Sequence, residues 1–257
     1  MHCPHLFVIL DKLRSFDNEN KMLFSFALCS LICNFAHIIN ASKHYRKTSS
    51  SIMKLVIMTK STFFVEEDKI ISTLFEDGLE RLHLYKPGSS PIFSERLLSL
   101  LKEDYHKRII VHEHFYLKDE FKLGGIHLDQ ADEAEAPKGY KGKVSRACND
   151  LAKLKDLKKR ADYVFLRNIF DSIEYRDRGE TSTFTMQQLE DAARQGLIDK
   201  HVYAMGGMTL NNLNIARELG FGGVVICGDL WNRFDIQSEK DFSGLINYFE
   251  KLRKAVE

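Results

Sequence analysis

The hydrophobic and polar positions of this chain alternate in short blocks from residue 53 onward. Apolar runs predict strands at residues 55–58, 81–85, 108–112, 125–128, 143–147, 163–166, 202–205 and 223–227. Amphipathic segments predict helices at residues 66–76, 92–101, 115–121, 151–159, 186–195 and 242–256, with one more after Thr209. Strands that alternate with helices over about 200 residues predict a (β/α)8 TIM barrel. An open doubly wound sheet is the alternative, but no G-x-G-x-x-G motif follows the first strand.

The most regular part of this pattern is the segment at residues 202–230. Two apolar strands each run into glycine, Gly206-Gly207 after the first and Gly228 after the second. Between them, Thr209 is placed to cap a helix that ends at Gly220. Such glycines let a ligand approach backbone N–H groups, and barrels often bind phosphate after strands seven and eight. Two tight turns without a ligand are the alternative. We expect phosphate contacts at Gly206, Gly207, Met208, Cys227 and Gly228.

Residues 1–52 do not continue the alternating pattern. An apolar run at residues 22–39 is near the shortest length that spans a bilayer, and it carries Asn34 and His37. The polar stretch KTSSSI then separates this run from Met53, where the first strand begins. We expect residues 1–52 to be an N-terminal extension outside the fold, and residues 53–257 to form the barrel. A membrane or export segment and a docked accessory helix are the alternatives.

Charge and cysteine content narrow the class of protein only a little. The 37 basic and 36 acidic residues nearly cancel, with a net charge of +1, so nothing indicates a nucleic-acid partner. The five cysteines form no CxxC pair, and their odd number does not indicate a disulfide framework. We expect a cytoplasmic protein unless residues 1–52 are a targeting segment. For the oligomeric state, a homodimer is one alternative.

Polar side chains gather where the predicted strands end, which is the face on which such barrels carry their active sites. Glu113 and Asp132 follow neighbouring strands, and carboxylates suit Mg²⁺ that is shared with phosphate oxygens. Lys86 adds a cation that can meet phosphate charge. We expect these three residues to be catalytic, with Glu113 and Asp132 as the metal ligands. The candidate substrate-binding residues are His83, Tyr85, His112, Gln130, Ser145, Asn149, Arg167 and Arg176.

Two further histidines need a separate interpretation. His127 lies in the apolar strand GIHL, and we expect it to point into the barrel. His112 and His114 stand two residues apart, a spacing that could suggest a transition-metal site. Alternate strand positions face opposite sides of a sheet, so we do not expect both to bind one ion.

Several segments resemble the thiamine phosphate synthases and their TenI-like relatives. GGIHLDQAD at residues 124–132 resembles the family's Asp-Gly-Val-His-Leu-Gly-Gln-x-Asp segment, and ADYVFL at residues 161–166 resembles its Ala-Asp-Tyr-Val-Gly-Leu strand. YAMGGMTLNN at residues 203–212 resembles the Gly-Gly-Ile-x-x-x-Asn segment, and GFGGVVICG at residues 220–228 resembles the family's phosphate strand. The order of these segments matches the family from Met53 to the C-terminus. The resemblance implies a (β/α)8 barrel of thiamin biosynthesis.

The resemblance also implies a reaction and its partners. The synthase joins hydroxymethylpyrimidine diphosphate to thiazole phosphate, releases pyrophosphate and uses Mg²⁺, and we expect this activity here. The alternatives are a TenI-like thiazole phosphate tautomerase and a thiazole-phosphate-binding regulator without synthase activity.

The departures from the family pattern fall mostly in the diphosphate half of the expected site. The family's Gln-x-Arg-x-Lys signature appears here as His83, Tyr85 and Pro87, with Lys86 out of phase. The Asn-Asp pair of strand three is replaced by His112 and Glu113. The segment at residues 147–150 lacks the histidine that is the expected acid/base of the tautomerase branch. The loop after strand six has lost its glycine, proline and lysine, and Arg176 stands near the place of that lysine.

Overall fold

The structure is a computed structural model that describes residues 52–129, 135–171, 182–235 and 241–257. The chain divides into two compact units, and the described residues belong to the second, Ser50–Glu257. All of the expected N-terminal extension except Ile52 lies outside the described residues, so its role stays a prediction. No helix in the described ranges is long and apolar enough to cross a lipid bilayer.

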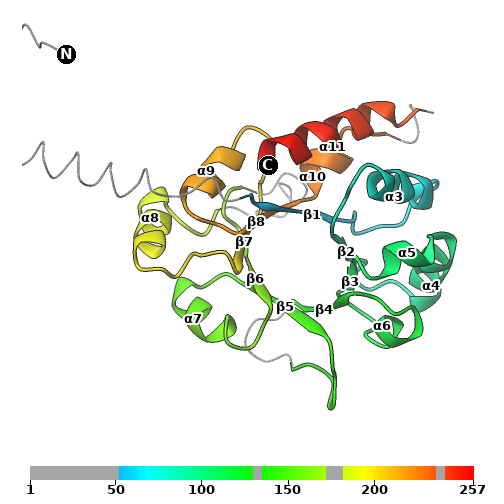
Figure 1. The fold of residues 1–257 in the computed structure, drawn as a ribbon, viewed down its shortest axis with the longest axis horizontal. Coiled ribbons are helices and arrows are strands. Elements are labelled where there is room, and N and C mark those ends of the chain that lie inside the picture. The colour runs from blue at the N-terminus through cyan, green and yellow to red at the C-terminus, as the bar shows by residue number, and fades with distance from the viewer. Residues whose placement is uncertain (1–51, 130–134, 172–181, 236–240) are drawn as a thin grey trace, which may run out of the picture. The chain divides into compact units, whose positions relative to one another are not determined.

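Eight parallel strands in the described part of the chain close into a barrel, which confirms the predicted fold class (Figure 1). The strands are β1 (Lys54–Met58), β2 (Leu82–Leu84), β3 (Ile109–Val111), β4 (Gly125–Leu128), β5 (Lys143–Cys148), β6 (Tyr163–Leu166), β7 (Val202–Met205) and β8 (Gly223–Ile226). Each strand pairs with the next in sequence, and β8 pairs with β1. This closure rules out the open doubly wound sheet.

The helices surround the ring of strands (Figure 1). They are α3 (Glu67–Glu76), α4 (Pro91–Leu100), α5 (Glu103–His106), α6 (Leu117–Glu120), α7 (Leu154–Leu157), α8 (Met186–Arg194), α9 (Leu213–Glu218), α10 (Gly228–Trp231) and α11 (Ser243–Val256), with a 3-10 turn η1 (Leu151–Lys153) before α7. The sequence pattern did not predict α5 and α10. Each has four residues, which is too short for a helical period to show.

One predicted helix cap was wrong. Helix α9 begins at Leu213 with Asn212 as its N-cap residue, not at Thr209. The Asn212 side chain instead ties the preceding turn together: its Oδ1 accepts the N–H of Thr209 at 2.8 Å, and its Nδ2 donates to the carbonyl of Gly207 at 2.9 Å. The turn after β7 is therefore fixed by its own hydrogen bonds. The predicted helix end at Gly220 is confirmed by its positive φ of 82° directly after α9.

Two apolar layers hold the barrel together. The larger layer packs the outward-facing side chains of the strands against the helices, with Ile70, Leu98 and Phe249 completely buried. The smaller layer fills the interior of the ring with Val56, Met58, Ala147, Tyr163, Phe165, Tyr203 and Val225. Gly223 makes room for the ring of Tyr203, because a Cβ at residue 223 would lie 2.9 Å from that ring.

The interior also contains polar side chains, and the strand register sets their positions. His127 on β4 pairs with Ser145 on β5, which pairs in turn with Tyr163 on β6. His83 on β2 pairs with Met58 on β1 and Ile110 on β3. Three neighbouring strands, β4 to β6, therefore present polar groups at one level of a barrel whose interior is usually filled by Val, Ile and Leu.

Candidate functional site

The carboxyl ends of the eight strands form one face of the barrel, which we call the mouth. The residues that reach it from successive strands are Thr59, Tyr85, Glu113, Asp129, Asn149, Arg167, Gly206 and Cys227. A side-chain hydrogen bond ties the first two strands here: the N–H of Tyr85 donates to Thr59 Oγ1 at 3.0 Å, and that hydroxyl donates to the Tyr85 carbonyl at 3.0 Å. The mouth therefore collects acidic, basic, aromatic and glycine positions, as barrel active sites do.

Three buried histidines, His83, His112 and His127, lie together just below the mouth, and we call them the histidine cluster. His83 Nδ1 lies 2.9 Å from His112 Nε2, and the rings of His112 and His127 stack with centroids 4.3 Å apart. His83 and His127 are completely buried, and His112 is 5% exposed. The predicted inward direction of His127 is confirmed. The buried position of His83 does not support direct substrate contact, because both of its ring nitrogens are bonded within the barrel.

Burial keeps His83 and His127 neutral. It lowers the pKa of His83 well below 6.5, and the nearby charge of His112 adds to this effect. Burial also lowers the pKa of His127 well below 6.5, with further contributions from His112 and His83. Neutral imidazoles have one nitrogen free to accept a hydrogen bond or bind a metal.

A directed hydrogen-bond chain links the cluster to the mouth. His112 Nδ1 lies 2.8 Å from Asp129 Oδ2. A carboxylate only accepts, so His112 Nδ1 donates to Asp129, and with His112 Nε2 as the acceptor, His83 Nδ1 is the donor of the next bond. His83 Nε2 then accepts from the hydroxyl of Tyr163 at 2.8 Å. Burial raises the pKa of Tyr163 to about 12, which keeps that hydroxyl protonated as a donor.

Glu113 and Asp129 are the carboxylates that the described residues bring to this side of the mouth. Glu113 is half-buried, and the N–H of Lys86 donates to its Oε2 at 3.3 Å. Burial raises the pKa of Glu113, and the negative charge of Asp129 raises it further. Two carboxylates at neighbouring strand ends can share a cation. The predicted partners Asp132, Gln130 and Arg176 lie outside the described residues.

Lys86 points away from the mouth. Its side chain is 1% exposed, and Nζ donates to Glu67 Oε1 at 2.6 Å and to the carbonyl of Thr62 at 2.9 Å. Its ammonium also lies 4.5 Å from the centroid of the Phe63 ring. The predicted catalytic role of Lys86 is not supported by this placement, because the charge is on the helix side of β2 and already has a counter-ion. Lys86 instead holds the segment between β1 and α3.

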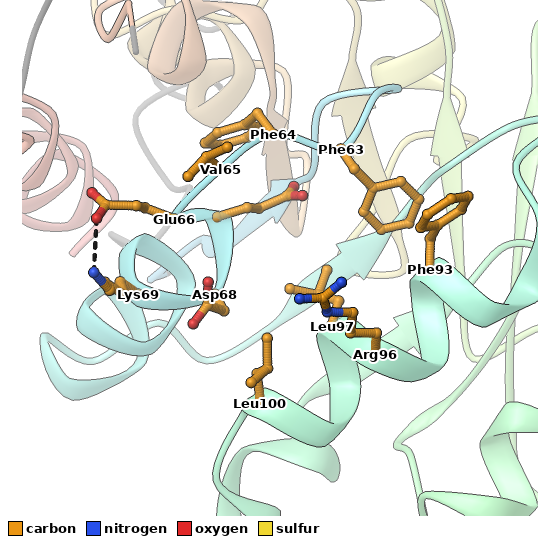
Figure 2. A pocket seen from close by; sticks show the side chains of 11 residues that line it. Phe63, Phe64, Val65, Glu66, Asp68, Lys69, Phe93, Arg96, Leu97 and Leu100 are labelled. Carbon is orange, nitrogen blue, oxygen red and sulfur yellow. Dashed lines mark hydrogen bonds and ion pairs between the residues drawn. The ribbon is translucent and has the colours of Figure 1, made fainter.

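Figure 2 shows the groove on the outer side of this segment. It is lined by the β1–α3 connection and by α4, including Phe63, Val65, Phe93 and Leu100. The ring centroids of Phe63 and Phe93 lie 5.8 Å apart, and Val65 is 74% exposed. The groove lies outside the ring of strands and has none of the mouth residues in its lining.

The predicted phosphate-binding residues lie together after β7 and β8. Gly206 and Gly207 have positive φ angles of 98° and 60°. A Cβ at Gly206 would lie 2.8 Å from the backbone N of Asn168, and one at Gly207 would lie 2.7 Å from Phe170 Cβ. Close packing against the loop after β6 therefore requires both glycines, whether or not a phosphate binds. Met208 and Gly228 are buried, and the Cys227 thiol donates to the carbonyl of Thr59 at 3.4 Å.

The remaining predicted substrate residues divide between the mouth and the interior. Tyr85 is partly buried, with its ring edge-on to that of His112 at 5.2 Å. Asn149 is exposed and Arg167 is half-buried, and both follow strands at the mouth. The Arg167 charge is close enough to lower the pKa of His127. Ser145 is buried, and its Oγ lies 2.8 Å from His127 Nδ1, so it acts from inside the barrel.

Two residues of this region were not among the sequence-based candidates. The sequence pattern gave no role to Asp129, although this residue stands two positions after His127 and therefore on the same inward side. That alternation is the signal that could have selected it. Tyr163 was read only as part of an apolar strand. Nothing in its local sequence indicates that its hydroxyl bonds His83 from the far side of the barrel.

The fold and the mouth together define a (β/α)8 barrel with a polar face at the carboxyl ends of its strands. A family model described as thiamine monophosphate synthase matches residues 94–230. Among solved structures, thiamine phosphate pyrophosphorylase from Bacteroides thetaiotaomicron is 46% identical, with a TM-score of 0.70 over 79% of this chain and 97% of that protein. The chain therefore belongs to the thiamine monophosphate synthase family, which includes the TenI-like proteins.

More distant structures share the fold alone. Thiamine phosphate pyrophosphorylase from Pyrococcus furiosus is 15% identical, with a TM-score of 0.60 over 80% of this chain and 96% of that protein. A 3-hexulose-6-phosphate synthase is 12% identical, with a TM-score of 0.54 over 80% of this chain and 100% of that protein. Among curated protein sequences, none matches this chain significantly.

Proposed function

We propose that this chain is a thiamine phosphate synthase. It would join hydroxymethylpyrimidine diphosphate to thiazole phosphate and release pyrophosphate. The observation that carries the proposal is the 46% identity to the Bacteroides pyrophosphorylase across 97% of that protein. A match that spans nearly the whole barrel includes both halves of the mouth, not only the phosphate end.

The thiazole phosphate would bind at the turns after β7 and β8. Gly206, Gly207 and Gly228 carry no side chains of their own, so a ligand could approach the backbone of these turns closely. Backbone N–H groups of Gly207, Met208 and Gly228 would then donate to phosphate oxygens. The hydrogen bonds of Asn212 hold the first of these turns in place before the ligand arrives.

The pyrimidine diphosphate would bind at the opposite side, above β2 to β4. The residues there fit Mg²⁺, because Glu113 and Asp129 offer carboxylate oxygens and the sequence adds Asp132 in the following loop. When bound, Mg²⁺ would offset the negative charge of the diphosphate. Arg167 at the end of β6 is a described cation of the mouth that can add to this. Lys86, already paired with Glu67, contributes by fixing the loop after β1.

The reaction depends on the positioning of its two substrates more than on proton transfer. The bond between the pyrimidine methylene carbon and the diphosphate oxygen breaks, and its electron pair leaves with pyrophosphate. The lone pair of the thiazole nitrogen then forms the new carbon–nitrogen bond. Holding the two substrates in line within the barrel mouth would supply most of the rate enhancement. Tyr85 and Asn149 stand at the mouth where they can contact the pyrimidine.

Calorimetric titration of the full chain tests this proposal. We expect thiazole phosphate to bind without metal, and pyrimidine diphosphate to bind only with Mg²⁺. The variant Asp132→Ala should lose the second binding event and keep the first. If pyrimidine diphosphate shows no metal-dependent binding to the wild type, the synthase assignment fails. Binding of thiazole phosphate alone would then leave a tautomerase or a binding protein of the same family.

A further inference from the structure

The interior of this barrel holds more polar groups than packing alone requires. His83, His112 and His127 are almost completely buried and come from three neighbouring strands. Burying a polar side chain costs free energy unless all of its polar atoms find partners. Among the described residues, His127 Nε2 is buried and has no hydrogen-bond partner. One ring nitrogen of His127 lies within 4.8 Å of a ring nitrogen of each of the other two histidines.

Each histidine of the cluster has one ring nitrogen held by an oxygen outside the cluster. His112 Nδ1 lies 2.8 Å from Asp129 Oδ2, and His83 Nε2 lies 2.8 Å from the Tyr163 hydroxyl. His127 Nδ1 lies 2.8 Å from Ser145 Oγ. Such outer partners are the usual companions of metal-binding histidines, because they fix the tautomer and orient the ring toward the ion.

The cluster also brings one ring nitrogen of each histidine together, and these three nitrogens lie within 4.8 Å of one another. His83 Nδ1 and His112 Nε2 are 2.9 Å apart. Three nitrogens at Zn²⁺ bond lengths in a tetrahedral site stand about 3.3 Å apart. The pair His83 Nδ1 and His112 Nε2 is already near this spacing, and the stacked rings of His112 and His127 must turn before all three nitrogens can reach one ion. Asp129 Oδ1, 3.6 Å from His127 Nε2, is next to the remaining position.

We propose that His83, His112 and His127 form a binding site for a divalent transition-metal ion of the Zn²⁺ type. Imidazole nitrogens suit such ions, whereas Mg²⁺ prefers oxygen. The fourth position faces Asp129 and the mouth, so water or a substrate atom can occupy it. This site uses the histidine nitrogens and differs from the magnesium position proposed at the mouth, with which it shares only Asp129. It does not depend on the synthase assignment.

Binding has a defined proton balance. Without metal, one proton lies between His83 Nδ1 and His112 Nε2. Both nitrogens need free lone pairs to bind the ion, so the proton of His83 must move from Nδ1 to Nε2 when the metal enters. The Tyr163 hydroxyl, 2.8 Å from His83 Nε2, then accepts the hydrogen bond that it donated before. Because this proton stays on His83, calorimetry in two buffers with different ionisation enthalpies should show little net proton release.

The test is a titration of chelator-treated full-length protein with Co²⁺ and Zn²⁺. Co²⁺ reports nitrogen coordination by its visible absorption, and Zn²⁺ should displace it. The chain has ten histidines and five cysteines, so the decisive quantity is a difference between variants. We expect His127→Gln to bind one equivalent less than the wild type and to lose the Co²⁺ absorption of this site. The control His114→Gln removes a histidine at the mouth whose Nε2 lies 3.0 Å from the Ser89 carbonyl, and it should bind like the wild type.

A second variant keeps the test decisive if His127→Gln does not fold. Asp129→Asn changes a side chain that is 33% exposed and that orients His112, so we expect the Zn²⁺ affinity to fall about 10- to 100-fold. The proposal is overturned if the wild type binds no tightly held Co²⁺. It is also overturned if the spectrum and stoichiometry are unchanged in both variants.

Discussion

Lys86 and Glu67 form a buried ion pair with 2.6 Å between Nζ and Oε1, and their side chains are 1% and 2% exposed. The pair links the end of β2 to the first turn of α3. One carboxylate oxygen, Glu67 Oε2, is buried without a partner among the described residues. Burial raises the pKa of Glu67 even though the charge of Lys86 lowers it. The pair therefore fixes the loop after β1 at a cost in desolvation.

Breaking this pair on one side should destabilise the barrel strongly. Lys86→Met leaves Glu67 buried without a counter-ion, and we expect a loss of about 3–5 kcal/mol in the free energy of unfolding. The double variant Lys86→Met/Glu67→Leu should recover most of that loss, because neither charge is then buried. Urea unfolding of the two single variants and the double variant measures this. Equal losses in the single and double variants would show that the pair does not act as a unit.

The exposed pair of Lys54 and Glu80 is the matched control. These side chains are 52% and 64% exposed and also form an ion pair at 2.7 Å. We expect Lys54→Met to change the unfolding free energy much less than Lys86→Met does. A comparable loss would mean that burial is not what makes the inner pair important.

Glu67 should also give a pH signature. Its pKa in the folded protein is raised above 4.5, so near that pH the folded form holds a proton more readily than the unfolded form. This contribution to stability is fully present below pH 4.5 and is lost as the pH rises through the raised pKa. Relative to Glu67→Gln, the wild type should therefore lose stability as the pH rises above 4.5. Unfolding curves at several pH values test this, and a constant difference would contradict it.

Gly207 is expected to be more sensitive to substitution than Gly220. Both have positive φ angles, 60° and 82°, so an alanine at either position costs about 1–2 kcal/mol in backbone strain. A Cβ at Gly220 meets nothing within 4 Å, whereas one at Gly207 would lie 2.7 Å from Phe170 Cβ. We expect Gly207→Ala to cost about 1–3 kcal/mol more than Gly220→Ala, measured by urea unfolding. Equal losses of unfolding free energy in the two variants would show that the loop after β6 moves to accommodate the added methyl group.

A chain shortened to residues 50–257 should fold with the thermal midpoint of the full chain. The described unit begins with Met53, which is 2% exposed and whose N–H donates to the Val256 carbonyl at 3.0 Å. Shortening to residues 57–257 removes most of β1, which closes the barrel between β2 and β8, and should abolish folding. If the 50–257 chain is insoluble while the full chain is soluble, residues 1–49 are needed for the fold.

Most of the fold could be predicted from sequence because the strands and long helices carry clear periodicity. The expected strand at residues 163–166 matches β6, and the helix expected at residues 186–195 matches α8 within one residue. The sequence predicted Thr209 as the helix cap because threonine is a common N-cap residue, but Asn212 is the N-cap residue of α9. The choice of Asn212 depends on a bond to the Gly207 carbonyl, which only the folded turn provides.

The candidate site was predictable in position but not in its contacts. The apolar strand around His127 correctly predicted its inward direction, whereas Lys86, which we expected to meet phosphate, is buried against Glu67. The convergence of His83, His112 and His127 depends on the register between three strands, which a single sequence does not fix. The partnership of Lys86 with Glu67 likewise needs the packing of α3 against the barrel.

One activity assay tests the proposed synthase function directly. The full chain, incubated with hydroxymethylpyrimidine diphosphate, thiazole phosphate and Mg²⁺, should release pyrophosphate and form thiamin phosphate in equal amounts. Glu113→Gln should lower the rate about 100-fold, the scale of losing one electrostatic stabiliser. Glu80→Gln, which changes the exposed partner of Lys54, should leave the rate unchanged. Formation of neither product by a wild-type protein that binds thiazole phosphate would contradict the synthase assignment.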